Sequence, residues 1–334
     1  MQIGKLSNEL LNALVLDTVK VDREDVLIGA STGEDCAALS FGSEVCVLST
    51  DPITGTAAEI GKLAVNIGLN DIASSGAKPV ALLMTLMCPE STSDLEIAKV
   101  VRDANETASK YNVAIIGGHT ERTSAVTRIV VSMTAIGKTT EDKLIKTGGA
   151  NAGDFLYMTK WAGLEGTGII AYEKEAVLKK ELSSGDLEEA FAMLEMTSVI
   201  KEGEIAASCG ATAMHDVTEG GILGAVYEMC EASGLGCEIN KNSISIKDVT
   251  ERICDHFIID PLRLISSGSM LIAIPPDKAS CLEVSFVEQN IPYSKIGTMT
   301  EEKDRILIYG EFELEAIKEE IPPPERDELY KVLE

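Results

Sequence analysis

Short apolar runs rich in Val, Ile and Leu recur through the first half of the chain and predict strands. Two helical segments lie between these runs, and the first of them closes at Gly76, just before Pro79. The predicted strands cover residues 26–28, 45–48, 80–87, 113–116 and 129–136, and the predicted helices cover residues 57–75 and 93–111. The pattern therefore predicts a first lobe of mixed α and β structure.

A seam of small and polar residues at 147–154 separates this lobe from a new apolar strand at 155–159. Three consecutive prolines at 322–324 cannot continue a helix, so the last residues form a short appended tail. We predict domains at residues 1–150 and 151–321, with the tail at 322–334. The predicted elements of the second domain are helices at residues 167–182, 187–195, 197–208 and 222–232 and a strand at 270–274.

Length and composition agree with this division. A chain of 334 residues is too long for one comfortable core and fits two domains of ordinary size. The chain is 45% hydrophobic but only 4% aromatic, so its interior must consist mainly of Ala, Val, Ile, Leu and Met. This composition favours helices packed on sheets, and we predict an α+β fold with mixed sheets covered by helices.

Charge and apolar patterning exclude several kinds of partner. The formal net charge of −25 repels a nucleic-acid backbone, and no basic stripe offsets it. The longest apolar run, residues 80–88, is less than half of the roughly 20 residues that a membrane helix needs. The N-terminus lacks the pattern of a secretory signal, so we expect a cytoplasmic protein. None of the eight cysteines forms a C-x-x-C pair, which disfavours zinc and iron–sulfur sites and indicates mostly buried, small apolar side chains.

Acidic residues follow a glycine turn and a strand end in the first lobe. Gly33 leaves Asp35 free to face a ligand, although a solvated loop would look the same. Asp51 comes directly after the strand at 45–48, so a rigid element would hold its carboxylate. Alone, Asp51 could simply cap the next element.

Polar side chains also interrupt the first predicted helix. Asn66 and Asn70 share one face because they lie four residues apart, and Asp71 lies about 100° further round. Buried amides and acids need partners, so the three residues indicate either a ligand site or a network of hydrogen bonds between helices.

Two further turns could bind phosphate. Gly117 and Gly118 end the strand at 113–116, directly before His119, and could present backbone N–H groups to an anion or form an ordinary tight turn. Asp216 and Thr218 precede the helix at 222–232, where helix capping and phosphate binding have the same sequence pattern.

The acidic residues together indicate a metal site. A carboxylate and a phosphate repel each other by roughly 4 kcal/mol per unit-charge pair at about 4 Å and an effective dielectric constant of about 20. Mg²⁺ suits oxygen ligands drawn from separate loops. No Walker A motif is present. Ser31 matches a G-x-S-x-G elbow, but no helix is predicted directly after it, so a serine hydrolase is disfavoured.

The set of motifs resembles the aminoimidazole ribonucleotide (AIR) synthase superfamily, within which the chain is most similar to the hydrogenase expression/formation proteins of the HypE type. The match runs from about Gly4 to Thr298. The motifs that carry it are Gly33-Glu34-Asp35-Cys36, Asn70-Asp71-Ile72-Ala73-Ser74-Ser75-Gly76, Gly117-Gly118-His119-Thr120-Glu121, Gly163-Leu164-Glu165-Gly166-Thr167-Gly168, Asp216-Val217-Thr218-Glu219-Gly220-Gly221 and Pro261-Leu262-Arg263-Leu264-Ile265-Ser266-Ser267-Gly268.

The resemblance implies an AIR synthase-like fold and a homodimer whose first domains pair their sheets into a shared β-barrel. It also implies ATP and Mg²⁺ as cofactors. Asp35, Asp51 and Asp71 would bind the metal, and Asp51 and Asp216 would take part in catalysis. The nucleotide would contact Lys5, Asn70, Gly117, Gly118, His119 and Thr218.

The reaction implied is transfer of the γ-phosphoryl group to the oxygen of an amide, carbamoyl or similar small acceptor, in hydrogenase maturation or a related pathway. HypE proteins modify their own C-terminal Cys, whereas the last cysteine here is Cys281. This difference favours a second function, a nucleotide-binding sensor or scaffold without turnover. The motifs are also compatible with a third, a small-molecule kinase of the thiamine-monophosphate kinase type.

Overall fold

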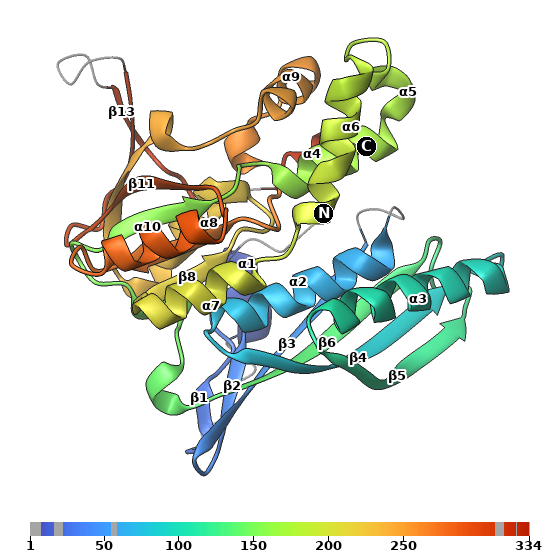
Figure 1. Cartoon of the computed structure of the whole chain (residues 1–334), viewed down its shortest axis with the longest axis horizontal. Helices are drawn as coiled ribbons and strands as arrows, with labels where there is room; N and C mark the ends of the chain where they lie inside the picture. Colours follow the sequence, from blue (N-terminus) through green and yellow to red (C-terminus); the bar gives the residue numbers. More distant parts are fainter. Residues whose placement is uncertain (1–7, 17–22, 55–58, 311–316, 325, 334) are drawn as a thin grey trace.

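A computed structural model describes residues 8–16, 23–54, 59–310, 317–324 and 326–333 of the chain. These residues form two lobes, each built on one β-sheet with helices packed against it (Figure 1). The predicted α+β fold with mixed sheets covered by helices is confirmed.

The first sheet contains every strand predicted for the first lobe. Its order is β1-β2-β3-β6-β4-β5, with β1 (Val26–Ile28), β2 (Ala37–Phe41), β3 (Glu44–Ile53), β6 (Val130–Thr139), β4 (Lys78–Cys88) and β5 (Ala114–Arg122). The sequence did not predict β2, because this strand is fixed by antiparallel pairing with β3 rather than by β-branched residues. Before this sheet the chain forms α1 (Asn8–Leu11) and a π-helix (Asn12–Leu16).

Two predictions about strand ends were wrong. Asp51 lies inside β3, because that strand continues its pairing with β6 as far as Ile53. Gly117 and Gly118 lie inside β5 rather than in a turn after it, because β5 runs parallel to β4 as far as Arg122. A Cβ atom on Gly118 would lie 1.9 Å from the carbonyl oxygen of Met84, so close backbone contact requires glycine here.

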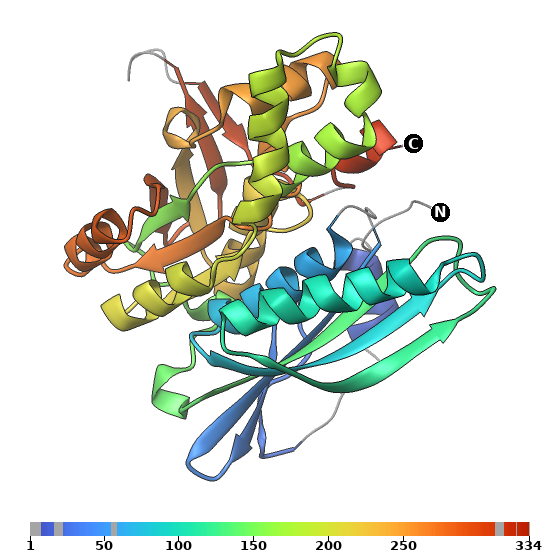
Figure 2. The same ribbon diagram turned by 45° about the vertical axis from the view of Figure 1, so that its right-hand side comes forward.

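Helices α2 (Ile60–Ser74) and α3 (Asp94–Lys110) cover one face of this sheet (Figure 2). A capping box between Ser93 and Glu96 fixes the start of α3. Every residue of α2 is buried, because the second lobe covers the side of this helix that faces away from the sheet. On the opposite face of the sheet, Leu83 and Ile116 are exposed, while Leu16 of the π-helix lines a cavity with Leu48 and Thr134.

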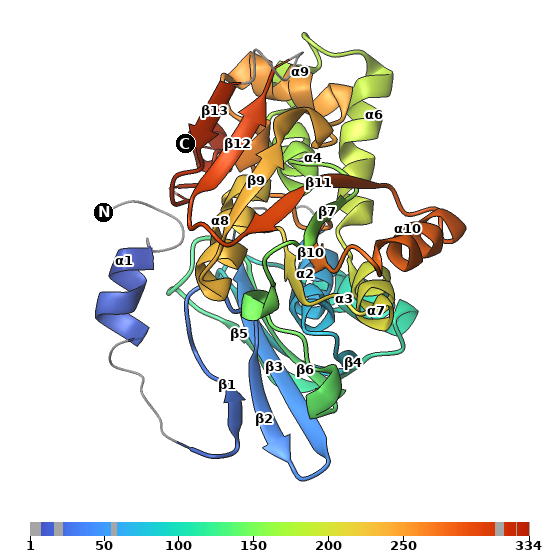
Figure 3. The ribbon, with the colours of Figure 1, turned by 90° about the vertical axis from the view of Figure 1, so that its left-hand side faces the viewer.

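The second sheet has the order β13-β12-β9-β11-β7-β10-β8, and β12 lies between β13 and β9 in Figure 3. Its strands are β7 (Phe155–Thr159), β8 (Ala213–Asp216), β9 (Gly236–Asn240), β10 (Met270–Ile274), β11 (Tyr293–Thr300), β12 (Arg305–Tyr309) and β13 (Ile317–Glu320). The helices are α4 (Leu164–Glu173), α5 (Glu175–Leu178), α6 (Ser184–Met193), α7 (Ile200–Cys209), α8 (Gly221–Ser233), α9 (Asp248–Phe257) and α10 (Ala279–Glu288). The single helix predicted at 167–182 is therefore two helices.

Asparagines of α2 join the two lobes. Asn70 Nδ2 donates to the carbonyl oxygen of Thr197 at 2.8 Å, and Asn70 Oδ1 accepts a hydrogen bond from the backbone N–H of Val199 at 2.8 Å. Asn66 Nδ2 donates to the Thr197 hydroxyl at 2.9 Å. Of the two interpretations of this polar face, the structure thus contains the hydrogen-bond network between secondary-structure elements.

The segment after the three prolines packs back onto the second lobe. It forms α11 (Leu329–Leu333), in which Leu329 and Val332 are buried in a cluster with side chains of α4. Asp327 accepts hydrogen bonds from the backbone N–H of Gly220 at 2.7 Å and of Leu329 at 2.8 Å. The tail is therefore part of the second lobe's core.

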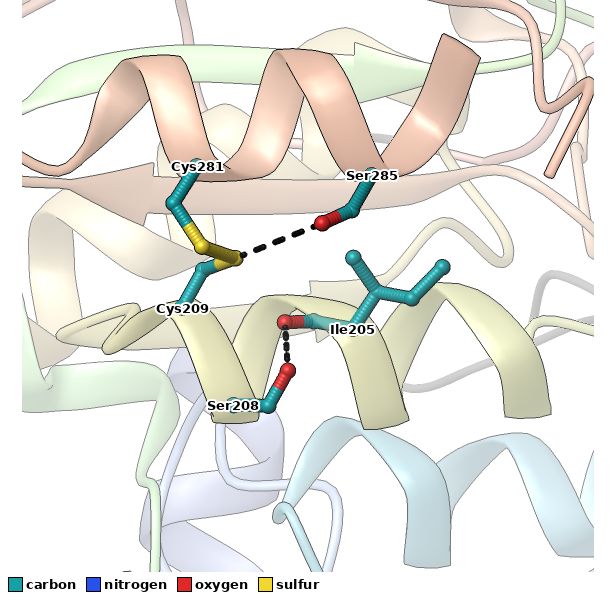
Figure 4. Close-up of a disulfide and its surroundings, with 5 residues drawn as sticks. All are labelled: Ile205, Ser208, Cys209, Cys281 and Ser285. Carbon is teal, nitrogen blue, oxygen red and sulfur yellow. Dashed lines mark hydrogen bonds between the residues drawn. A yellow bond between two sulfur atoms is a disulfide. The ribbon is translucent and has the colours of Figure 1, made fainter. Parts of the chain in front are cut away.

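A disulfide that the sequence did not predict joins α7 to α10 through Cys209 and Cys281 (Figure 4). The other six cysteines are free, and all of them except Cys46 are buried, as expected. No helix in the described part of the chain is both long and apolar enough to cross a membrane.

Candidate functional site

Four aspartates from separate parts of the fold line one cavity. Asp35 lies between β1 and β2, Asp51 lies in β3, Asp71 lies on α2, and Asp216 ends β8. Asp71 is 5% exposed and Asp216 only 1%. Burial, together with the negative charges of Asp216, Asp51 and Asp35, raises the pKa of Asp71 well above its usual range. The fold thus brings together the acids that the sequence indicated for metal binding and catalysis.

Neutral hydrogen-bond donors hold these carboxylates in position. Ser49 Oγ donates to the carboxylate of Asp71, and Ser74 Oγ donates to Asp35 Oδ2 at 3.1 Å. The Cys36 thiol donates to the carbonyl oxygen of Asp71 at 3.0 Å. Burial, with the nearby aspartates, raises the pKa of this thiol well above its usual range, so the thiol stays neutral beside the acids.

His215, the residue before Asp216, bridges two carboxylates. Its Nδ1 lies 2.8 Å from Asp35 Oδ2, and its Nε2 lies 3.0 Å from Glu228 Oε2. Burial alone would lower the pKa of His215, but the charges and hydrogen bonds of Asp35 and Glu228 raise it well above its usual range. Both ring nitrogens thus lie within hydrogen-bonding distance of a carboxylate oxygen, so His215 positions Asp35. Ligand atoms of Asp35, His215 and Asp216 also lie within 4.8 Å of one another, close enough to share a metal ion.

Two cavities meet at these acids. One cavity of ≈ 980 Å³, including its open mouth, lies between the lobes, and another of ≈ 820 Å³ lies against the first lobe beside β2 and β3. Glu34, Asp35 and Asp51 line both cavities. A group bound at these carboxylates would therefore be accessible from both cavities.

The second lobe's wall of the larger cavity carries residues that the sequence did not single out as site residues. Glu165, on α4, is 3% exposed. Its burial raises its pKa to about 7, against the opposing effect of the neighbouring Ser267 hydroxyl and N–H. Tyr330, on α11, also lines this wall and donates its hydroxyl hydrogen to Glu219 at 2.7 Å. The sequence pattern that could have indicated Glu165 is an acidic residue between Gly163 and Gly166, at the start of an otherwise apolar helix.

The remaining site predictions fall in different places. Thr218 lines the interlobe cavity, in the loop before α8. Asn70 is bonded to the second lobe and is not among the residues that line either cavity. His119 lies with the two glycines on the exposed strand β5, where its Nε2 is 3.3 Å from Glu121. Lys5 lies outside the described residues.

The fold and the site define a two-lobed α+β protein in which both lobes contribute acids to one shared cavity. The chain belongs to the AIR synthase-related family: residues 33–139 match its N-terminal domain, and residues 151–310 match its C-terminal domain.

Relatives of the hydrogenase-maturation type are similar over most of this length. The chain is 31% identical over 287 residues to a putative hydrogenase expression/formation protein of Methanocaldococcus jannaschii, covering 84% of this chain and 83% of that protein. It is 25% identical over 282 residues to the carbamoyl dehydratase HypE of Rhodobacter capsulatus, covering 83% and 80%.

Solved structures share the fold. HypE in a HypE–HypF complex aligns with a TM-score of 0.75 and 22% identity, over 94% of this chain and 99% of that chain. HypE in complex with ATP aligns with a TM-score of 0.72 and 20% identity, over 99% and 98%.

Proposed function

We propose that this protein is an ATP- and Mg²⁺-dependent enzyme that transfers the γ-phosphoryl group to the oxygen of an amide or carbamoyl acceptor. Phosphorylation converts a poor leaving oxygen into a good one, as dehydration of a carbamoyl group requires. Two of its relatives are named as a carbamoyl dehydratase and a hydrogenase expression/formation protein, and we propose the same setting of hydrogenase maturation. The related HypE in complex with ATP supports the choice of nucleotide.

One observation carries the proposal: Glu34, Asp35 and Asp51 form a boundary that two cavities share. Phosphoryl transfer needs a donor and an acceptor on opposite sides of the transferred group, roughly in line. The cavity on the first lobe would hold the nucleotide, and the cavity between the lobes would hold the acceptor. The transferred phosphoryl group would then lie beside the shared carboxylates.

The residues present fit Mg²⁺. All four aspartates offer oxygen ligands, and Asp71 and Asp216 are buried where unneutralised negative charge is costly. Asp35, Asp51 and Asp71 would hold the metal, with Asp216 approaching the phosphates from the second lobe. Bound Mg²⁺ would neutralise charge on the phosphate oxygens. The protein's own part is positional: Ser49 and Ser74 orient the carboxylates, and His215 fixes Asp35.

We further propose that the protein is a homodimer whose first lobes pair their sheets. The sheet face away from α2 and α3 exposes Leu83 and Ile116, which are 38% and 62% exposed in a single chain. His119, Gly117 and Gly118 lie on the edge strand β5 and are not among the residues that line either cavity, so we propose that they contact a nucleotide bound to a second copy. A monomeric mass by light scattering at micromolar concentration would contradict this arrangement.

Replacing Asp51 tests the enzymatic proposal. Asp51→Asn keeps the shape of the side chain but removes the charge from the boundary of both cavities, so we expect ADP release from MgATP to fall by at least about a hundredfold. Asp277→Asn is the matched control, because Asp277 is exposed and is not among the residues that line either cavity. Unchanged turnover in the Asp51 variant would refute the mechanism, and MgATP binding without turnover by the wild type would favour the sensor.

A further inference from the structure

Two buried oxygens in the interlobe cavity make no hydrogen bond of ordinary length and angle among the described residues, although their two side chains lie close enough for Ser267 to lower the pKa of Glu165. They are Oε2 of Glu165 and Oγ of Ser267, which lie on neighbouring side chains of the same wall. Glu165 is 3% exposed and Ser267 is 1% exposed. Leaving such groups unsatisfied is unfavourable, so buried polar atoms of this kind usually meet water or a ligand.

Apolar side chains lie beside these two oxygens on the same wall, which also carries Asp216, Thr218, Glu219 and Tyr330. Ile169 of α4, Ile265 and Leu329 of the C-terminal helix all line the interlobe cavity with Glu165 and Ser267. An apolar surface with a small number of convergent polar groups is typical of a site for a small organic molecule. Leu329 belongs to the tail, so the segment after the prolines completes this part of the cavity.

The chemistry of the wall restricts the ligand. Glu165 and Glu219 carry carboxyl groups into the cavity, and the shared aspartates lie at its other side, so an anionic group would be repelled. Ionised Glu165 accepts a hydrogen bond at Oε2, the Ser267 oxygen accepts another, and a primary carboxamide nitrogen donates two. A molecule held in this way could direct its carbonyl oxygen away from Glu165, toward the shared carboxylates.

We infer that Glu165 and Ser267 bind the NH₂ group of a small uncharged carboxamide or carbamoyl substrate, whose apolar part packs on Ile169, Ile265 and Leu329. The inference rests on the proposed function, because it assigns the acceptor to the interlobe cavity. Glu165 and Ser267 are binding residues in this scheme, and the variants below leave the shared aspartates unchanged.

Benzamide serves as the probe, with benzoate and N,N-dimethylbenzamide as matched compounds that lack the neutral NH₂ group. Binding to the full-length protein is measured by saturation-transfer NMR in the presence of Mg²⁺ and a non-hydrolysable ATP analogue. We expect benzamide to bind at least about tenfold more tightly than either matched compound, because neither of them can donate hydrogen bonds to the buried oxygens of Glu165 and Ser267.

Variants then test the two residues. Glu165→Leu removes the carboxyl group and Ser267→Ala removes the hydroxyl, and each should weaken benzamide binding by about tenfold or more. Glu173→Leu, at an exposed position on the same helix, should leave it unchanged. If Glu165→Leu fails to fold, the benzamide affinity of Ser267→Ala still tests the inference. The affinity for the ATP analogue, measured by calorimetry, should stay within about twofold of the wild type in every variant.

Equal binding of benzamide to wild type and both variants would overturn the inference, as would preference for benzoate or absence of benzamide binding. Failure of the wild type to bind the ATP analogue with Mg²⁺ would instead refute the proposed function. The calorimetric and NMR measurements thus distinguish the two failures.

Discussion

Asn70 offers a direct test of how the two lobes are held together. This side chain is 0% exposed and makes hydrogen bonds at 2.8 Å to the carbonyl oxygen of Thr197 and the N–H of Val199. Asn70→Ala would leave both backbone groups buried without a partner. Each such group costs about 1–3 kcal/mol, so we expect the free energy of unfolding to fall by about 4 kcal/mol.

Asn66 provides a matched control on the same face of α2. Its Nδ2 makes one hydrogen bond, to the hydroxyl of Thr197, and that hydroxyl also donates to the carbonyl oxygen of Leu194 at 3.2 Å. Asn66→Ala therefore leaves no Thr197 group unpaired, and we expect a loss of about 1 kcal/mol. The difference between the two variants depends on the hydrogen bonds to Thr197 and Val199, since both replacements remove the same side chain from one helix.

Urea unfolding, followed by the fluorescence of Trp161 and by far-UV circular dichroism, measures both losses. Calorimetric titration of MgATP is performed on the same samples. If Asn70→Ala unfolds within about 1 kcal/mol of the wild type but loses ATP affinity more than about tenfold, Asn70 is a nucleotide ligand and the structural role is refuted.

Two further predictions concern the second lobe. Burial raises the pKa of Glu165 from 4.5 to about 7, so the folded state binds the proton of Glu165 more tightly than the unfolded state does. As pH rises from below 4.5 to above 7, the free energy of unfolding of the wild type should therefore fall by about 3 kcal/mol relative to that of Glu165→Gln. Parallel pH profiles of the unfolding free energy for the two proteins would contradict this. The Cys209–Cys281 disulfide closes a separation of 72 residues, so Cys281→Ser should lower the stability of the oxidised protein by about 4 kcal/mol. Wild type treated with dithiothreitol should match that variant in urea unfolding, and an unaltered midpoint would refute the contribution.

Local pattern was sufficient where a segment's own residues determine its structure. The strands at Phe155–Thr159 and Met270–Ile274 were predicted to the residue, because each is an apolar run bounded by polar or turn-forming residues. Helix α3 begins where Ser93 and Glu96 form a capping box.

The sequence was insufficient where distant segments meet. Gly117 and Gly118 look like a turn until β5 pairs with β4, and only that pairing shows that Gly118 lies against Met84. Glu165 and Ser267 are separated by about a hundred residues, and no periodicity relates them. Their common cavity exists because α4 and the loop before β10 pack together, a property of the second lobe as a whole.

The position of Asp35 links the site to the arrangement of the lobes. Asp35 belongs to the first lobe and accepts a hydrogen bond from Ser74 of the same lobe, yet it also contacts His215 of the second lobe at 2.8 Å. Any displacement of one lobe against the other must therefore stretch one of these contacts or carry Asp35 away from Asp71. A ligand that contacts both lobes makes different contacts before and after such a displacement. Its binding can therefore shift the equilibrium between the two arrangements of the lobes. A ligand in the interlobe cavity would consequently change the positions of the carboxylates that also line the cavity on the first lobe.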